Sequence, residues 1–295
     1  MSDEENSEEI LEKYRQAGKI LSQVVKEASE MVDVGVSLLA VAELAENLIR
    51  EKGAEPAFPC NISRNDEAAH ATPCPGDKTV FGNDMVKLDI GAHIDGYIAD
   101  MAVTVDLSDH PELVDAAEVA LSESIKIVRD GTNIADIGAV IEQTINEFGY
   151  KPVMNLTGHG LSRYNQHGPP SIPNKKVKKG ITLKEGDIIA IEPFATDGAG
   201  RVSDRGVPEI FCVLKVKPIR SREARALLQE IETYQTLPFA KRWLKTGRLD
   251  YALKQLERAN IIHSYPTLKD DGGGLVSQAE HTMIVQKDGC EVTTL

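Results

Sequence analysis

Residues 84–105 read DMVKLDIGAHIDGYIADMAVTV, in which apolar residues alternate with polar or small ones on both sides of an Asp95-Gly96 pair. Alternation with period two is typical of a β-strand that has one buried face. Asp-Gly between two such runs is a strong signal for a tight hairpin turn. The stretch therefore predicts two antiparallel strands that meet at Asp95-Gly96.

The hairpin register places two carboxylates, Asp89 and Asp100, on one face of the predicted sheet. With a two-residue loop, Gly91 opposes Asp100 and Asp89 opposes Ala102, and directly opposed residues share a face. A four-residue loop would place the two acids opposite each other, again on the same side. Two carboxylates on a buried face repel each other unless a cation lies between them. The pair indicates either a metal site or two exposed acids on the polar side of a hairpin.

The rest of the chain alternates between helix-rich and strand-rich stretches. Apolar residues at three- and four-residue steps predict two helices within 10–52, the second ended by Gly53. The same patterns predict helices at 111–129, 133–149 and 221–262, strands at 187–195, 209–217 and 279–286, and loops at 56–84 and 150–180. Segments 84–89 and 187–192 share a scheme in which two acids bracket four residues with apolar ends. This internal echo suggests two related α+β halves, each of which places a carboxylate on a strand.

Composition limits the classes to which the protein can belong. The chain has 295 residues and a formal net charge of −13, with 41% hydrophobic and 27% charged residues. These values are typical of a globular protein and argue against a DNA-binding or membrane-surface protein. No apolar run approaches the ~18 residues of a membrane span, and we expect residues 1–9 to be a disordered acidic tail without a secretory signal. Since Cys60, Cys74, Cys212 and Cys290 are widely spaced, we expect reduced thiols and a cytoplasmic location.

Three further residues extend the aspartate pair toward a metal site. Glu192 lies within an apolar run, where an unpaired carboxylate would be costly, Glu280 precedes another such run, and His159 lies in an expected loop. Four carboxylates and one imidazole suit divalent Mn, Fe, Co or Zn, and a carboxylate-bridged pair of such cations is usual in hydrolases. His70 and His167 lie in Pro- and Gly-rich segments, where substrate-contacting groups are common, although such a histidine can also be merely exposed.

Five segments resemble the methionine aminopeptidase family, whose members have the creatinase-like, "pita-bread" fold. They are 68–73 (AAHATP), 87–104 (KLDIGAHIDGYIADMAVT), 157–159 (TGH), 190–194 (AIEPF) and 278–282 (QAEHT). The resemblance implies an α+β fold, with two pseudo-related halves around a curved antiparallel sheet, in one catalytic domain of residues 10–295. The long interval between Glu192 and Glu280 resembles type 2 members of archaea and eukaryotes, which carry a helical insert that we expect at 220–262. The short acidic start resembles the archaeal members.

The same resemblance implies a role for each candidate metal ligand. Asp89 would hold one divalent cation, Asp100 and Glu280 would bridge two cations, and His159 with Glu192 would complete the second site. Glu192 would also act as the general base toward the bridging water. The implied cofactors are two cations per subunit, Co, Mn, Fe(II) or Zn.

The resemblance also implies residues that contact the substrate. His70 and His167 would be catalytic residues that contact the scissile peptide. The pocket for the methionine side chain would be lined by Phe58, Phe194 and Tyr265. Gln166 departs from the pattern, because an apolar pocket residue is expected at that position. The implied reaction removes the N-terminal methionine from nascent polypeptides whose second residue is small.

Two alternatives and one partner remain to be considered. The first alternative function is that of an X-Pro peptidase of the same fold, a class that usually carries a separate N-terminal domain. The second is that of an inactive relative that binds RNA or the ribosome, a class that would lose metal ligands. Residues 215–262 hold eleven Lys or Arg and five Asp or Glu, a net charge of +6 that leaves −19 for the rest. This basic stretch is interpreted as a solvated helical face or as a ribosome-facing surface that includes Arg222, Arg225, Lys241 and Arg242. We expect a monomer.

Overall fold

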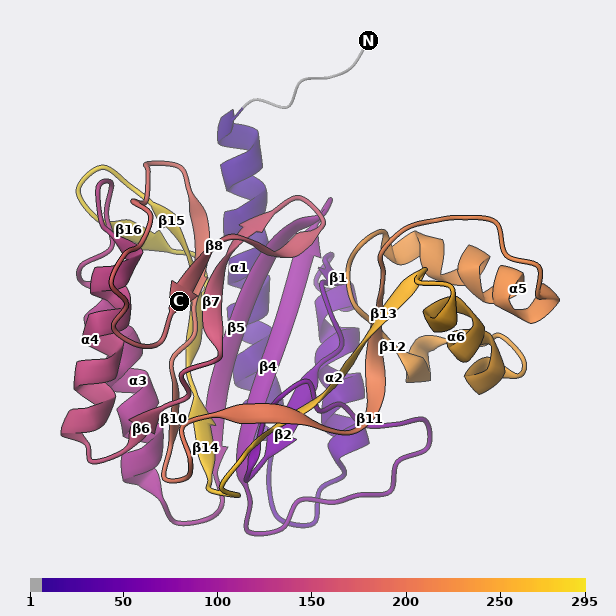
Figure 1. Ribbon diagram of the computed structural model, residues 1–295, viewed down its shortest axis with the longest axis horizontal. Coiled ribbons are helices and arrows are strands. Elements are labelled where there is room, and N and C mark those ends of the chain that lie inside the picture. The colour runs from indigo at the N-terminus through magenta and orange to yellow at the C-terminus, as the bar shows by residue number, and fades with distance from the viewer. Residues whose placement is uncertain (1–6) are drawn as a thin grey trace.

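The predicted hairpin lies at the centre of the computed structural model, which describes residues 7–295 (Figure 1). Strands β4 (Met85–Ile94) and β5 (Tyr97–Asp106) are joined by Asp95-Gly96, whose φ angles are 52° and 89°. The register pairs Asp89 with Ala102 and Gly91 with Asp100, so the two-residue loop is confirmed. The two aspartates therefore share one face of adjacent strands.

The hairpin belongs to a nine-stranded antiparallel sheet. Its order is β1-β4-β5-β15-β9-β7-β8, with β2 also paired to β4 and β16 to β15. The further strands are β1 (Glu55–Pro56), β2 (Asn61–Arg64), β7 (Thr157–Ser162), β8 (Asn165–Pro173), β9 (Ile188–Ile191), β15 (Glu280–Val285) and β16 (Cys290–Val292). Strands from residues 55–106 and strands from residues 157–292 therefore lie side by side in a single sheet.

Two smaller sheets border this large one. The first has the order β14-β10-β6 and the second β12-β11-β13-β3. Their strands are β3 (Glu67–Ala69), β6 (Lys151–Pro152), β10 (Phe194–Thr196), β11 (Val202–Val213), β12 (Phe239–Ala240), β13 (Ile262–Asp270) and β14 (Val276–Gln278).

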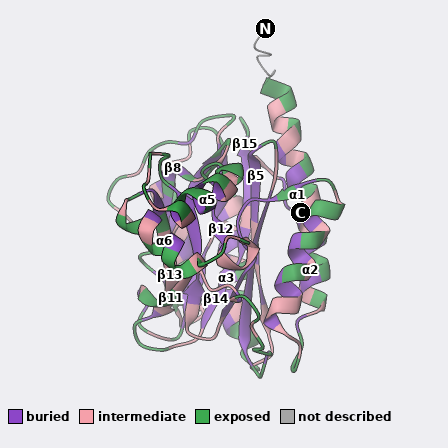
Figure 2. Cartoon of the chain, turned by 90° about the vertical axis from the view of Figure 1, so that its right-hand side faces the viewer, coloured by how far each residue is buried: buried purple, intermediate pink, exposed green. Residues whose placement is uncertain are grey.

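Two helix pairs cover the sheet, one for each half of the molecule. Helices α1 (Ser7–Glu30) and α2 (Leu38–Glu51) share an apolar core with β4, whereas α3 (Pro111–Ile125) and α4 (Ile134–Glu147) share a second core with β9 and β15. Figure 2 shows that α1 and α2 turn buried residues inward and exposed residues outward. The arrangement confirms the predicted α+β class and its two halves.

The boundaries of α2 follow from local chemistry, and the start of α1 differs from the prediction. The Ser37 hydroxyl accepts a hydrogen bond from the Ala40 N–H at the start of α2, and Gly53, with φ of 88°, ends it in the left-handed region. The predicted disordered tail is wrong for residues 7–9, which form the first turn of α1. Residues 1–6 of that predicted tail lie outside the described residues.

The helical insert lies between β11 and β13. Helices α5 (Arg222–Ile231) and α6 (Leu249–Arg258) enclose an apolar core of their own, to which Phe211 and Ile262 of the flanking strands also belong. The predicted helical stretch 221–262 is interrupted by the 3₁₀ turns η1 (Glu232–Tyr234) and η2 (Lys241–Trp243) and by strand β12. In Figure 1 the insert projects to one side of the large sheet.

Several predicted loops and strand bounds are corrected by the structure. The expected loop 56–84 contains β2 and β3, and the expected loop 150–180 contains β6, β7 and β8. These strands lack an alternating apolar pattern, and pairing with β4 and β9 holds β2 and β7 extended. The predicted strand 187–195 is broken at Glu192-Pro193, because proline has no N–H for the ladder, and the predicted strand 209–217 is shifted to β11, which spans Val202–Val213.

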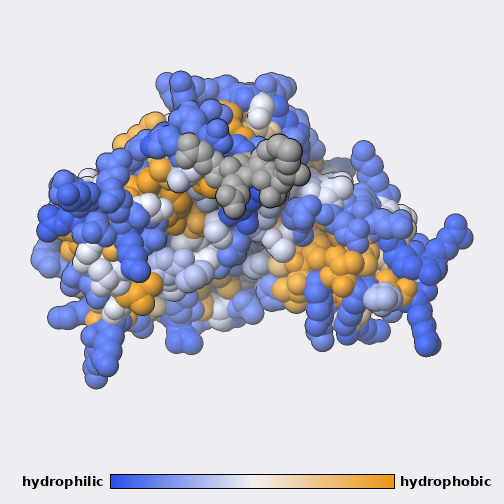
Figure 3. All heavy atoms as spheres, turned by 90° about the horizontal axis from the view of Figure 1, so that it is seen from above, coloured by the Kyte–Doolittle hydropathy of each residue, from blue (hydrophilic) through white to orange (hydrophobic). Residues whose placement is uncertain are grey.

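Hydrophilic side chains dominate the face of the molecule seen in Figure 3, with smaller apolar areas between them, one of which lies toward the insert. All four cysteines are free thiols. Within residues 7–295, no helix combines the length and apolar character needed to cross a bilayer.

Candidate metal centre

Five adjacent strands of the large sheet each position one candidate metal ligand. Asp89 lies on β4, Asp100 on β5 and His159 on β7, while Glu280 begins β15 and Glu192 directly follows β9. These strands are neighbours in the order β4-β5-β15-β9-β7. Asp89 and Glu280 both pair with Ala102 of β5, so their side chains share the face on which Asp100 lies.

Carboxylate oxygens of three of the four acids lie close to the imidazole of His159. Its Nε2 lies 3.6 Å from Glu192 Oε1, 3.8 Å from Asp100 Oδ2 and 4.0 Å from Glu280 Oε1. Ligand atoms of Asp100, His159 and Glu280 all lie within 4.8 Å of one another. These separations are too long for hydrogen bonds. They match ligands that share a cation, because groups each about 2.1 Å from one ion lie about 3–4 Å apart.

Burial raises the pKa of all four carboxyl groups. Desolvation raises the pKa of Asp89 to about 7. Desolvation raises the pKa values of Asp100, Glu192 and Glu280 well above their usual range, and neighbouring acids raise them further. Burial also lowers the pKa of His159 to about 3, with a smaller contribution from His167. The centre therefore combines acids that resist ionisation together with a neutral imidazole.

The chemistry of these residues fits a bound divalent cation. Among the described residues, Asp89 Oδ1, Asp100 Oδ1 and Glu280 Oε1 are buried and have no hydrogen-bond partner. A buried polar atom without a partner costs about 1–3 kcal/mol, and a cation would satisfy carboxylate oxygens directly. Four carboxylates with one imidazole form a metal-binding set of the kind that suits Mn, Fe, Co or Zn.

His70 and His167 lie next to this centre on different elements. His70 follows β3 in a left-handed conformation, with φ of 62°, and its ring packs edge-on against Tyr265 at 5.3 Å between centroids. His167 lies on β8, and its ring is perpendicular to that of His159 at 4.7 Å. The predicted loop positions of His159 and His167 are thus wrong, whereas that of His70 is confirmed. Burial lowers the pKa of His70 to about 4, so its imidazole is neutral near pH 7.

One cavity of about 330 Å³ brings together every residue that the sequence analysis proposed for the site. The lining includes Phe58, His70, Asp89, Asp100, His159, His167, Glu192, Phe194, Tyr265 and Glu280. Phe58 and Phe194 are buried and form an apolar wall next to the acids. A Cβ at Gly91 would lie 2.1 Å from Phe58 Cε1, so glycine at this position leaves space for the phenyl ring.

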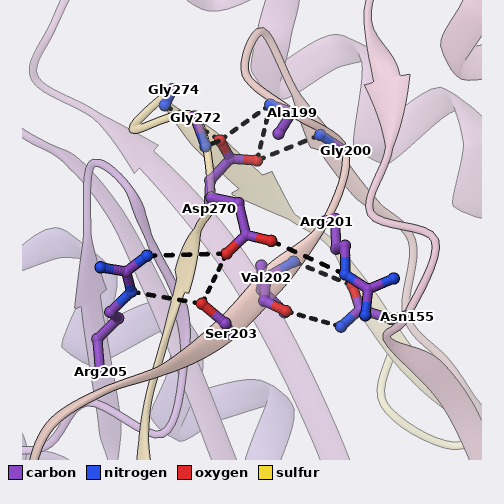
Figure 4. A network of polar contacts seen from close by, with 11 residues as sticks. Asn155, Ala199, Gly200, Arg201, Val202, Ser203, Arg205, Asp270, Gly272 and Gly274 are labelled. Atoms are coloured by element: carbon purple, nitrogen blue, oxygen red, sulfur yellow. Dashed lines mark hydrogen bonds and ion pairs between the residues drawn. The ribbon is translucent and has the colours of Figure 1, made fainter.

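Sequence reasoning missed Asn155, which also lines the cavity. Val202 N donates to Asn155 Oδ1 at 3.0 Å, and Asn155 Nδ2 donates to Val202 O at 2.8 Å (Figure 4). The turn before Val202 is fixed in its place by Asp270, whose carboxylate accepts hydrogen bonds from Ala199 N at 2.9 Å and Gly200 N at 3.2 Å. No local sequence signal could reveal this support, because its members lie far apart in the chain.

Comparison with known proteins places the chain among metallopeptidases. Residues 12–237 match the profile of metallopeptidase family M24. The chain is 53% identical to a methionine aminopeptidase of Archaeoglobus fulgidus, over 97% of this chain and 99% of that protein. Another methionine aminopeptidase, of Methanocaldococcus jannaschii, is 50% identical over 96% of this chain and 98% of that protein.

Solved structures share the architecture. A methionine aminopeptidase from Thermotoga maritima superimposes with a TM-score of 0.73 at 23% identity, covering 100% of this chain and 99% of that one. A thermophilic Arx1 gives a TM-score of 0.84 at 18% identity, covering 96% and 90%. At these identities the likeness shows the fold alone, and that fold is the expected pita-bread architecture.

Proposed function

The chain belongs to metallopeptidase family M24, and we propose that it is a metal-dependent methionine aminopeptidase of type 2. It would hydrolyse the first peptide bond of proteins and peptides that begin with methionine and have a small second residue. The observation that carries this proposal is the buried set of four carboxylates and one imidazole beside an aromatic wall in a single cavity. High identity to methionine aminopeptidases over nearly the full chain supports the same activity.

We assign the ligands to two cations. Asp89 would hold the first, His159 and Glu192 would hold the second, and Asp100 and Glu280 would be shared between them. When bound, such cations supply an activated water and stabilise the charge that develops on the carbonyl oxygen. Mn, Fe(II), Co and Zn all suit this ligand set.

The protein's own residues would position the substrate and move the proton. Glu192, whose buried carboxyl has a raised pKa, would accept a proton from the attacking water and deliver it to the leaving amine. The neutral imidazole of His70 would hydrogen-bond to the scissile peptide, and His167, which lines the same cavity, would contact its carbonyl oxygen.

The methionine side chain would lie against Phe58, Phe194 and Tyr265. An unbranched thioether fits an apolar pocket with aromatic walls, where sulfur–aromatic contacts are favourable. The free α-amine of the substrate would bind beside the buried acids. A peptide bond in the interior of a chain has no free amine next to it and would therefore not be cleaved.

The partners would be nascent polypeptides in the cytoplasm, and the protein would act as a monomer. Ribosome contact through the basic insert rests on Arg222 and Arg225, which are both exposed. Lys241 lies 2.8 Å from Asp250, and the side chain of Arg242 is only 4% exposed and pairs with Glu46. Both cations therefore already have a carboxylate partner within the protein. Charge reversal at Arg222 and Arg225 should weaken ribosome co-sedimentation, whereas Lys26→Glu on α1 should not; unchanged co-sedimentation would refute the contact.

A peptide assay tests the proposed activity. Chelator-treated protein should not release methionine from Met-Ala-Ser, and separate addition of Mn, Fe(II), Co or Zn should restore release. Asp100→Ala, Glu192→Ala and Glu280→Ala should abolish it, while Asp288→Asn, at an exposed residue, should not. Full activity of the metal-stripped protein, or a preference for X-Pro peptides, would refute the proposal.

A further inference from the structure

Gln166 occupies a position where the sequence resemblance leads us to expect an apolar pocket residue. It lies on β8 and lines the same cavity as the acids. Its side-chain Nε2 donates a hydrogen bond to Asp100 Oδ2 at 3.3 Å. The polar side chain therefore contacts one of the two carboxylates that we assign as shared ligands.

The contact involves one particular oxygen of Asp100. Oδ2, which accepts from Gln166, is also the atom that lies 3.8 Å from His159 Nε2. Oδ1 is buried and has no hydrogen-bond partner among the described residues. The amide thus holds the oxygen on the His159 side and leaves the other oxygen free.

The second shared carboxylate also accepts a hydrogen bond from a carboxamide, but through Oε2, whereas its Oε1 is the oxygen that lies 4.0 Å from His159 Nε2. Gln278 Nε2 donates to Glu280 Oε2 at 3.4 Å, and Glu280 Oε1 is left without a partner among the described residues. An uncharged carboxamide suits this task, because it orients a carboxylate without neutralising the charge that attracts a cation. Lysine or arginine would compete with the cation, and leucine or methionine could not donate.

We propose that Gln166 is a positioning residue, which fixes the Asp100 carboxylate for the cation on the His159 side of the centre. The inference rests on the proposed metal-dependent function. The contact comes from β8, which lies next to β7 in the sheet and carries none of the five proposed metal ligands. Groups that hydrogen-bond to metal ligands typically contribute 10- to 100-fold to metal affinity. Loss of the Gln166 amide should therefore lower the affinity for the cation held on the His159 side more than the affinity for the other cation.

Calorimetric titration of chelator-treated protein with Mn²⁺ alone tests this inference. Gln166→Met keeps the length of the side chain and removes the donor, and Gln166→Leu provides a second apolar variant. We expect one binding step to weaken 10- to 100-fold in both variants and the other to change by less than threefold. Asn165→Ala, at an exposed neighbour on β8, is the matched control and should bind as the wild type does.

The outcomes separate this inference from the proposed function. If wild-type protein binds no Mn²⁺, the proposed function fails. If wild-type protein binds and both Gln166 variants bind within twofold of it, the positioning role alone is overturned. A role confined to folding would lower the melting temperature of the metal-free variants, which we expect to stay within 2 °C of wild type. At limiting Mn²⁺ the variants should lose activity toward Met-Ala-Ser, and excess Mn²⁺ should restore it.

Discussion

Removal of the Glu46 charge should loosen the helical insert from the body of the protein. Glu46 on α2 is 3% exposed, and its carboxylate accepts hydrogen bonds from Trp243 Nε1 at 2.7 Å, from Cys60 N at 3.1 Å and from Arg242. Arg242 Nη1 also donates to Thr72 Oγ1 at 2.7 Å. This buried ion pair is one of the contacts that join η2 of the insert to α2, together with the Arg50 guanidinium over the Trp243 ring.

The two partners of the ion pair should respond unequally. In Glu46→Gln the guanidinium of Arg242 stays buried without a counter-charge and cannot lose its proton, which should cost about 3–5 kcal/mol. In Arg242→Met the remaining carboxyl can take up a proton, because desolvation already raises the pKa of Glu46. That variant should lose less stability, and the loss should shrink as the pH falls. The double variant should lose less than the sum of the two single changes, since neither charge is left alone.

Urea unfolding followed by two signals measures these effects. Trp243 is the only tryptophan of the chain and lies within the ion-pair cluster, so its fluorescence reports the insert, whereas far-UV circular dichroism reports the whole fold. In Glu46→Gln the fluorescence transition should move to lower urea than the dichroism transition. Glu51→Gln, an exposed substitution on the same helix, should change stability by less than about 0.5 kcal/mol. A loss below about 1 kcal/mol in Glu46→Gln would refute the reasoning.

Three further outcomes are expected. His70→Ala should lower kcat/KM for Met-Ala-Ser by about 10²- to 10⁴-fold while calorimetry shows unchanged metal affinity; loss of metal would contradict the assigned role. Gly91→Ala should displace the Phe58 ring, because the new Cβ would lie 2.1 Å from Phe58 Cε1, and should raise KM for methionyl peptides. The substitution should also lower the free energy of unfolding by about 1–3 kcal/mol. A KM equal to that of the wild type would contradict the assignment of Phe58 to the methionine pocket. Metal affinity should fall as the pH drops from 8 to 6, because Asp89, with a pKa raised to about 7, holds a proton below that pH and must release it to bind; a pH-independent affinity would contradict this.

The sequence predicted the hairpin and the shared face of its acids because both depend on local rules. Alternating residues fix which side chains face the same way, and a two-residue Asp-Gly turn fixes the register. The pairing of Asp89 with Ala102 follows directly from these two facts. The same alternation does not predict the burial of Lys87, which takes the place of a polar, exposed residue in the pattern. Lys87 is fully buried, and its Nζ donates a hydrogen bond to Asn65 O at 3.0 Å.

The predictions that were wrong concern elements whose structure depends on partners far away in the sequence. Strand β7 carries His159 in the sequence TGHGLS, which has no apolar alternation, and β9 and β8 hold it extended from either side. Glycine at 158 and 160 is required by that packing, because a Cβ there would lie 2.4 Å from Ala190 O and 2.0 Å from Pro169 O. These close approaches exist only in the folded protein.

The residue types, the hairpin and the resemblance of five segments were thus present in the sequence alone, and together they named every proposed ligand. The tertiary structure decided the order β4-β5-β15-β9-β7, which brings five proposed ligands from residues 89 to 280 together. It also decided that Gln166 contacts Asp100 and that Arg242 is buried against Glu46. The physical reason is that local periodicity and turn geometry act between near neighbours in the chain. Strand order and the pairing of buried charges are set instead by hydrogen bonds and desolvation between segments that meet only when the chain folds.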